Sequence, residues 1–301
     1  MQEDSLQAVV VGAGTMGATL AKLMAVHGVK VTVVDTNPQV LETSRLRMGA
    51  NAAAVSFTTE LKVKKNPDFV IESVTENVTV KQKVLAQIED GVAESTVIMT
   101  NTSGIPIDDI SSAMRIPQRF VGTHFFNPAD IVPVVEVVPG SHTEAPVVEQ
   151  TCRWLRRLGK RPAVLNTCVP GFVANRIQHA VMRECLSLLE KGVVETAALD
   201  DIVQYSIGIR MALNGPLCQR DLNGLDTHLN IARYLYPDID ARQEPAALLE
   251  EHVAQGRLGA KVGRGFYYWT DESRARHQAQ ERKSLQRIIE IATQHSSGGE
   301  P

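Results

Sequence analysis

Short apolar runs alternate with amphipathic stretches through the first half of the chain. The apolar runs are rich in Val and Ile and have the length of buried strands. We expect strands at 8–11, 29–34, 53–58, 69–74, 96–101, 120–126, 132–138 and 161–166. The stretches between them predict helices at 18–27, 38–48, 79–90, 106–114 and 145–158. This alternation predicts a mainly parallel sheet with helices on both faces.

The pattern changes near Pro170-Gly171. A long helical pattern covers 172–191 and is followed by Gly192, a residue type that commonly ends helices. More helices are expected at 196–206, 224–234, 245–255 and 271–294. The second half is therefore expected to be mostly helical.

A glycine-rich turn directly follows the first apolar run. Residues 12–17 read Gly-Ala-Gly-Thr-Met-Gly, the pattern G-x-G-x-x-G. Gly12 permits a tight turn, Gly14 lets the backbone approach a pyrophosphate, and Gly17 lets helix and strand pack closely. The following helix offers free N–H groups and a partial positive charge to that pyrophosphate. We therefore expect Gly12, Gly14, Thr15, Met16 and Gly17 to bind a dinucleotide.

Asp35 closes the second predicted strand, 18 residues after Gly17. A carboxylate at this place accepts hydrogen bonds from the adenosine ribose and would repel a 2′-phosphate, so NAD is favoured over NADP. The fold class expected is α/β. A Rossmann-type, mainly parallel NAD-binding domain at 1–168 precedes an all-helical substrate and dimerisation domain at 169–301.

Composition narrows the class of protein further. The 301 residues carry a formal net charge of −3, so charge gives no reason to expect nucleic acid or a membrane surface as a partner. The start of the chain lacks the basic and then apolar layout of a signal peptide. The four cysteines are widely spaced, which favours reduced thiols in the cytoplasm over disulfides or a metal site.

Candidate acid–base chemistry lies on two neighbouring predicted strands. Hydride transfer from an alcohol to nicotinamide needs a base for the hydroxyl proton. His124 ends one strand, and Glu136 lies among valines on the next, where a lone carboxylate is costly to bury. A carboxylate on Nδ1 would fix the histidine tautomer and raise the basicity of Nε2. Taken singly, His124 also fits a satisfied core histidine, and Glu136 an edge-strand contact with solvent.

These motifs resemble the L-3-hydroxyacyl-CoA dehydrogenase family over roughly residues 6 to 270. In the first half the matching elements are 12–17 with Asp35, 72–76 with Lys81, 101–103, 124–128 and Glu136. In the second half they are 170–176, 215–216, 224–226 and 259–267. The resemblance implies a Rossmann domain, a helical dimerisation domain and a homodimer.

The resemblance also implies roles for individual residues. His124 would be the catalytic acid and base, oriented by Glu136, while Ser103 would bond the substrate oxygen and Asn175 would position the substrate. The residues implied to contact NAD, besides the glycine turn and Asp35, are Glu76, Lys81, Asn101, Ser103, Asn127 and Lys261. A catalytically idle protein, like the lens crystallin branch of the family, is disfavoured because these chemical groups are intact.

Two departures from the family pattern concern the substrate. Only 32 residues lie between Asp35 and Asp68, so most of the helical hairpin that helps hold coenzyme A in relatives cannot be present. Nearby Lys62, Lys64 and Lys65 fit either a phosphate contact or a solvated charge run.

The second departure is the segment 208–216, which is longer than the usual loop and resembles the branch of L-gulonate 3-dehydrogenase and carnitine dehydrogenase. Its Arg210 fits either a substrate carboxylate or a salt bridge within the helical domain. We expect a short L-3-hydroxyacyl substrate, with a CoA thioester favoured. A free 3-hydroxy acid and a carrier-bound group are the alternatives.

Overall fold

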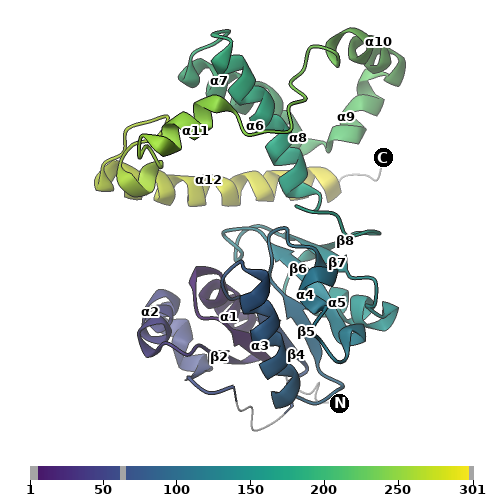
Figure 1. The fold of residues 1–301 in the computed structure, drawn as a ribbon, viewed down its shortest axis with the longest axis vertical. Helices are drawn as coiled ribbons and strands as arrows, with labels where there is room; N and C mark the ends of the chain where they lie inside the picture. Colours follow the sequence, from purple (N-terminus) through teal and green to yellow (C-terminus); the bar gives the residue numbers. More distant parts are fainter. Residues whose placement is uncertain (1–5, 62–65, 298–301) are drawn as a thin grey trace. The chain divides into compact units, whose positions relative to one another are not determined.

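The computed structural model describes residues 6–61 and 66–297. The chain forms two compact units, Met1–Arg176 and Ile177–Pro301, and each is described here by itself (Figure 1). Lys62, Lys64 and Lys65 lie outside the described residues. Among the described residues, no helix is long and apolar enough to cross a membrane.

The first unit is built on one eight-stranded sheet. Its strands are β1 (Gln7–Val11), β2 (Lys30–Val34), β3 (Val55–Thr58), β4 (Phe69–Glu72), β5 (Val97–Thr100), β6 (Phe120–Phe125), β7 (Val134–Pro139) and β8 (Arg161–Val164). Their order is β3-β2-β1-β4-β5-β6-β7-β8, and β6 with β7 is the one antiparallel pair in this sheet. The predicted mainly parallel Rossmann sheet is therefore confirmed, with the strand order 3-2-1-4-5-6 of that fold running from the β3 edge and β7 and β8 added beyond β6.

Helices cover the sheet of the first unit (Figure 1). They are α1 (Thr15–Val26), α2 (Pro38–Met48), α3 (Val78–Gly91), α4 (Ile107–Ser111) and α5 (Ala145–Arg157), with the 3-10 turns η1 (Gly49–Ala54) and η2 (Pro117–Arg119). Successive strand residues point to opposite faces, so Val9 and Val10 belong to two separate core clusters. Both faces are thereby buried, as a parallel sheet requires.

Local sequence explains where two of these helices begin. Asn37 caps α2 by accepting a hydrogen bond from the backbone N–H of Gln39, and Pro38 occupies the first helical position. Asn77 caps α3 in the same way by accepting from the N–H of Val80. Both caps place the start of a helix just beyond the carboxyl end of a strand, where ligands of open α/β sheets bind.

The second unit is helical. Its elements are α6 (Ala174–Glu190), which begins in the first unit, α7 (Thr196–Ile202), the π turn η3 (Val203–Gly208), α8 (Ile209–Leu213), α9 (Pro216–Asn223), α10 (Leu225–Leu235), α11 (Ala247–Ala254), the 3-10 turn η4 (Ala260–Val262) and α12 (Asp271–Ser297). The segment 208–216, expected as a loop, is mostly the helix α8. The chain stays helical through Gly208 and breaks at Asn214 and Gly215, directly before Pro216 at the first position of α9.

Candidate active site

The three glycines of the turn after β1 occupy three different environments. Gly12 has a φ of +102°, and a Cβ there would lie 2.5 Å from the carbonyl oxygen of Ser73. A Cβ on Gly17 would lie 1.9 Å from the carbonyl oxygen of Gly12, so α1 and β1 approach too closely for any side chain. A Cβ on Gly14 would meet open space. The turn therefore leaves room over Gly14 for a phosphate group to approach the backbone.

Asp35 lies against this turn. Its Oδ2 accepts from the N–H of Ala13 at 2.9 Å, and its Oδ1 accepts from the N–H of Asn37 at 2.9 Å. Each carboxylate oxygen keeps a further lone pair for a ribose hydroxyl. A cavity of about 470 Å³ opens beside it, and its walls include Val11, Gly12, Val34, Asp35, Thr36 and Val74. A mainly apolar cavity that has an acidic residue in its wall and lies next to the open glycine turn fits the adenosine end of NAD.

A buried ion pair lies at the carboxyl end of β4. The side chains of Glu72 and Lys81 are both 0% exposed, and Lys81 Nζ lies 3.0 Å from Glu72 Oε1. The hydroxyl of Thr100 and the N–H of Val74 also donate to this carboxylate, at 2.6 and 2.7 Å. The carboxylate is thus fully paired, which a buried charge requires. Glu72 was not among the predicted site residues, although it carries the same signal as Glu136: an acid in an apolar strand, where a lone carboxylate is costly to bury.

Glu76 joins this ion pair to the loop after β5. Its Oε2 lies 3.4 Å from Lys81 Nζ. Its Oε1 accepts from the hydroxyl of Thr102 at 2.6 Å and from the N–H of Ser103 at 2.7 Å. Asn101 adds a second link, because its amide donates to the Ser73 hydroxyl at 3.2 Å. The loops after β4 and β5 are therefore one connected polar layer at the edge of the sheet.

His124 and Glu136 lie directly opposite each other on the antiparallel strands β6 and β7. His124 Nδ1 is 2.7 Å from Glu136 Oε2, and the two side chains are 7% and 4% exposed. Glu136 Oε1 accepts from the backbone N–H groups of Val173 and Ala174, both at 3.0 Å. The alternative of an edge-strand solvent contact for Glu136 is therefore wrong. A carboxylate facing Nδ1 favours the proton on that atom and leaves Nε2 as an acceptor.

The segment after β8 closes over this pair. Phe172 is fully buried with a φ of +52°, and its ring centroid lies 5.8 Å from that of His124. Positive φ is uncommon outside glycine, so this residue is held in a strained conformation at the site. A Cβ on Gly104 would lie 2.9 Å from the Cα of Gly171, which lets the two backbones touch. Asn175 then donates to the carbonyl oxygen of Ser103 at 2.6 Å. Sequence reasoning gave no role to Phe172, whose conformation has no sequence signal.

The remaining predicted residues are Asn127, Lys261 and Arg210. Asn127 follows β6 and is exposed. Lys261 lies in η4 and Arg210 in α8, both in the second unit. The side chain of Arg210 donates to the carbonyl oxygen of Ser206 at 2.7 Å, one turn back along the chain.

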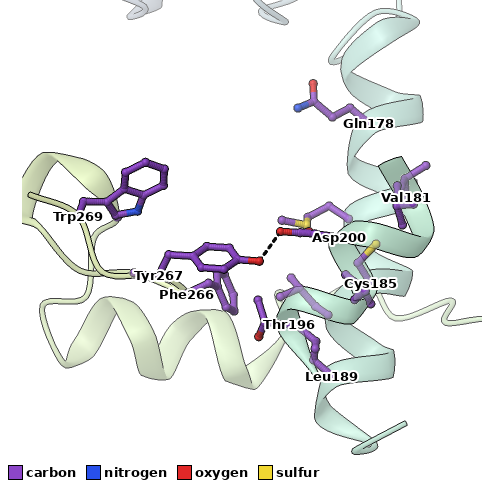
Figure 2. Close-up of a pocket in the computed structure, with 15 residues that line it drawn as sticks. Gln178, Val181, Cys185, Leu189, Thr196, Asp200, Phe266, Tyr267 and Trp269 are labelled. Atoms are coloured by element: carbon purple, nitrogen blue, oxygen red, sulfur yellow. Dashed lines mark hydrogen bonds between the residues drawn. The ribbon is translucent and has the colours of Figure 1, made fainter. Parts of the chain in front are cut away.

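The second unit has an apolar cavity of its own, shown in Figure 2. Its volume is about 450 Å³, and its walls come from α6, α7 and the segment 259–269. The Tyr267 hydroxyl donates to Asp200 Oδ2 at 2.6 Å, and this bond raises the pKa of Tyr267 to about 12. Burial likewise raises the pKa of the Cys185 thiol in the wall of the cavity. No sequence motif pointed to this cavity.

The fold and the glycine turn define the chain as a dinucleotide-dependent oxidoreductase. Residues 7–168 match the NAD-binding domain of 3-hydroxyacyl-CoA dehydrogenase, and residues 171–269 match the C-terminal domain of the same enzyme. The chain belongs to the 3-hydroxyacyl-CoA dehydrogenase family, and its cofactor is NAD. The expected resemblance and cofactor are confirmed.

The names of two curated relatives give two different kinds of substrate, a pyridine carboxylate and a hydroxyacyl-CoA. A 5-formyl-3-hydroxy-2-methylpyridine 4-carboxylate 5-dehydrogenase of Mesorhizobium japonicum is 32% identical over 93% of this chain and 97% of its own length. A probable 3-hydroxybutyryl-CoA dehydrogenase of Bacillus subtilis is 30% identical over 89% of this chain and 98% of its own length.

Two solved structures repeat this division. That of a 5-formyl-3-hydroxy-2-methylpyridine 4-carboxylic acid 5-dehydrogenase, described as an NAD⁺-dependent dismutase, superposes with a TM-score of 0.92 at 30% identity, covering 98% of this chain and 100% of the other. The structure of (S)-3-hydroxybutyryl-CoA dehydrogenase from Ralstonia eutropha superposes with a TM-score of 0.74 at 32% identity. It covers 89% of this chain and 100% of the other.

Proposed function

We propose that this NAD-dependent enzyme interconverts a hydroxyl and a carbonyl group, with His124 as acid and base. The observation that carries the proposal is the buried contact between His124 Nδ1 and Glu136 Oε2 at 2.7 Å. It leaves Nε2 to take the hydroxyl proton of the substrate during oxidation and to return it during reduction. The Glu136 carboxylate stabilises the imidazolium that forms.

NAD bound at the glycine turn and Asp35 would supply the hydride acceptor. The polar layer of Glu76, Lys81 and Asn101 is proposed to face its nicotinamide half. The Ser103 hydroxyl is proposed to donate to the substrate oxygen, where negative charge develops. Asn175, fixed by its bond to the Ser103 carbonyl oxygen, is proposed to orient the substrate beside His124.

For the substrate, we favour a small hydroxy compound with a free carboxylate, such as a 3-hydroxy acid. The described residues between Asp35 and Asp68 form α2, η1 and β3, which supports the expectation that most of the family's helical hairpin is missing from this chain. The similarity to an enzyme named for a free pyridine carboxylate supports the same choice. Arg210 remains a candidate to bind the substrate carboxylate. Lys261 remains a candidate to contact the nicotinamide half of NAD. A short L-3-hydroxyacyl-CoA is the second candidate, favoured by the names of the other relatives.

A comparison of NADH oxidation with acetoacetyl-CoA and with free 3-oxo acids tests the substrate. We expect kcat/KM for the best free acid to equal or exceed that for the thioester. The His124→Ala variant is the control, because it should abolish both activities. A thousandfold preference for acetoacetyl-CoA would establish the second candidate.

We also propose a homodimer formed through the second unit. The side chains of Ile177, Val181 and Met182 on α6 are 45–46% exposed, and two of them also line the cavity of Figure 2. A continuous apolar surface of this kind favours association with a second copy. Light scattering should give twice the chain mass of 32.9 kDa at micromolar concentration.

A cytoplasmic location is the last part of the proposal. Its support is that Cys152, Cys168, Cys185 and Cys218 are all free thiols. Free thiols persist where glutathione keeps them reduced. Cell fractionation would test it, and recovery in a secreted fraction would contradict it.

A further inference from the structure

An arginine from α2 contacts the cofactor turn. Arg47 lies in the last turn of α2, and its Nη1 donates to the hydroxyl of Thr15 at 2.9 Å. Thr15 is the first residue of α1 and follows Gly14 directly. A guanidinium therefore stands at the place where the glycine turn meets the helix N-terminus.

The packing of α2 explains how Arg47 reaches this place. Leu41, Ser44 and Met48 form the buried face of α2, and α1 lies beside it (Figure 1). Residues two apart on a helix point in different directions. Arg45 accordingly lies over the ring of Phe57, with its Cζ 4.6 Å from the ring centroid, while Arg47 reaches α1.

The N-terminus of α1 has no side-chain cap and no acidic residue of its own. Its N-cap residue is Gly14. The first N–H groups of the helix are thus free for an anion. No ion pair is recorded for Arg47 within residues 6–61 and 66–297. Two independent sources of positive charge, the helix end and the guanidinium, therefore meet beside the open space over Gly14.

We propose that Arg47 binds the pyrophosphate of NAD and that Thr15 positions its guanidinium. A guanidinium matches two phosphate oxygens at once, which a lysine cannot do. Arg47 lies outside the G-x-G-x-x-G motif and is not part of the Asp35 signal. The proposed cofactor contact is therefore supplied by α2. The proposal concerns cofactor binding alone and does not depend on which substrate is correct.

Binding titrations with NADH, ADP and adenosine test the proposal in the full-length apoenzyme. Arg47→Ala should weaken the binding of NADH and ADP by about tenfold, or roughly 1.4 kcal/mol, and leave adenosine unchanged. Arg47→Lys should recover part of the loss, and Thr15→Val should show a smaller loss than Arg47→Ala. Added salt should weaken NADH binding less in Arg47→Ala than in the parent protein, because one screened contact is gone.

Arg45→Ala is the matched control, since it removes the same charge from the same helix. It should change NADH affinity by less than about twofold, because its guanidinium lies over Phe57. Equal losses in the two variants would overturn the proposal in favour of a general charge effect. A loss for adenosine as large as that for ADP, or a loss for NADPH without one for NADH, would place Arg47 on the adenosine half instead.

Discussion

The two units of the chain differ in how completely they bury their own apolar surface. In the first unit, two core clusters fill both faces of the sheet, and they contain fully buried side chains such as Phe69 and Ile98. In the second, Leu186, Leu199 and Ala246 are the buried apolar residues among those that the structure describes. Many large apolar side chains of the second unit are exposed, including those of Leu217 at 80% and Tyr234 at 71%.

We infer from this difference that the first unit carries the proposed chemistry and the second unit carries the proposed dimer interface. The buried carboxylates of Glu72 and Glu136 have partners inside the first unit, so this part of the site is formed by the fold itself. The second unit presents apolar helix faces that its own residues do not cover, as the proposed dimer interface requires. Substitutions in the first unit should therefore change catalysis, and those on α6 should change association.

The largest expected effect lies in the first unit. We predict that His124→Ala and Glu136→Ala each lower kcat by about a thousandfold, because each removes part of one proton-transfer unit. The double variant should be little worse than the worse single variant, because members of one unit are not additive. Stopped-flow or steady-state kinetics measures kcat, and NADH fluorescence shows whether cofactor binding survives, as it should. Multiplicative losses would mean that Glu136 acts separately from His124.

The next effect concerns the second unit. Val181→Glu should weaken the dimer by more than about a hundredfold, or roughly 2.8 kcal/mol, because an unpaired charge would be buried at the proposed interface. Analytical ultracentrifugation would show one chain of 32.9 kDa in place of two. Val26→Glu is the matched control, since Val26 is 62% exposed on α1 of the first unit. Equal dissociation in both variants would argue against α6 as the interface.

The first unit was largely predictable from its sequence, and the reason is local. Apolar runs with the length of strands, separated by capped helices, determine the order of the elements. Asp35 follows the end of β2, and His124 lies one residue before the end of β6, so the parallel strands bring both to one edge of the sheet. The pairing of His124 with Glu136 was predictable because both lie at strand positions where isolated polar groups are costly.

Contacts between distant segments were not predictable. The bond between Arg47 and Thr15 depends on the angle at which α2 crosses α1, and no pattern in α2 sets that angle. The burial of Lys81 depends on Glu72 lying beneath it, although lysine is almost never fully buried. In the second unit, the segment 208–216 was expected as a loop by resemblance, and no sequence signal shows that Gly208 keeps helical φ and ψ and leads into α8.

A smaller effect should appear in cofactor choice. We predict that Asp35→Ala reduces the preference for NADH over NADPH by about tenfold, because the carboxylate no longer repels a 2′-phosphate. Fluorescence titration of both cofactors measures the ratio. Asp35→Asn keeps an oxygen for the N–H of Ala13 but removes the charge, and it should behave like Asp35→Ala. Discrimination that survives in both variants would assign the preference to other residues.

The smallest expected effect is a titration in the cavity of Figure 2. The pKa of Tyr267 is raised to about 12 because its hydroxyl donates to Asp200, a bond that the phenolate cannot make. A raised folded-state pKa favours the neutral form. The stability from this bond is therefore fully present below the unfolded pKa of about 10 and is lost as the pH rises from there through about 12.

Ultraviolet absorbance of tyrosinate, with Tyr267→Phe as the subtraction control, measures this pKa directly. Asp200→Asn should lower it, because the carboxylate that opposes the phenolate charge is gone. Comparing the parent protein at concentrations above and below its dimer dissociation constant then connects the titration to assembly. If a second copy covers the cavity, the dimer should titrate at higher pH than the monomer, since covering removes water from the phenolate. Identical titrations in the two forms would mean that this cavity stays open to solvent in the dimer.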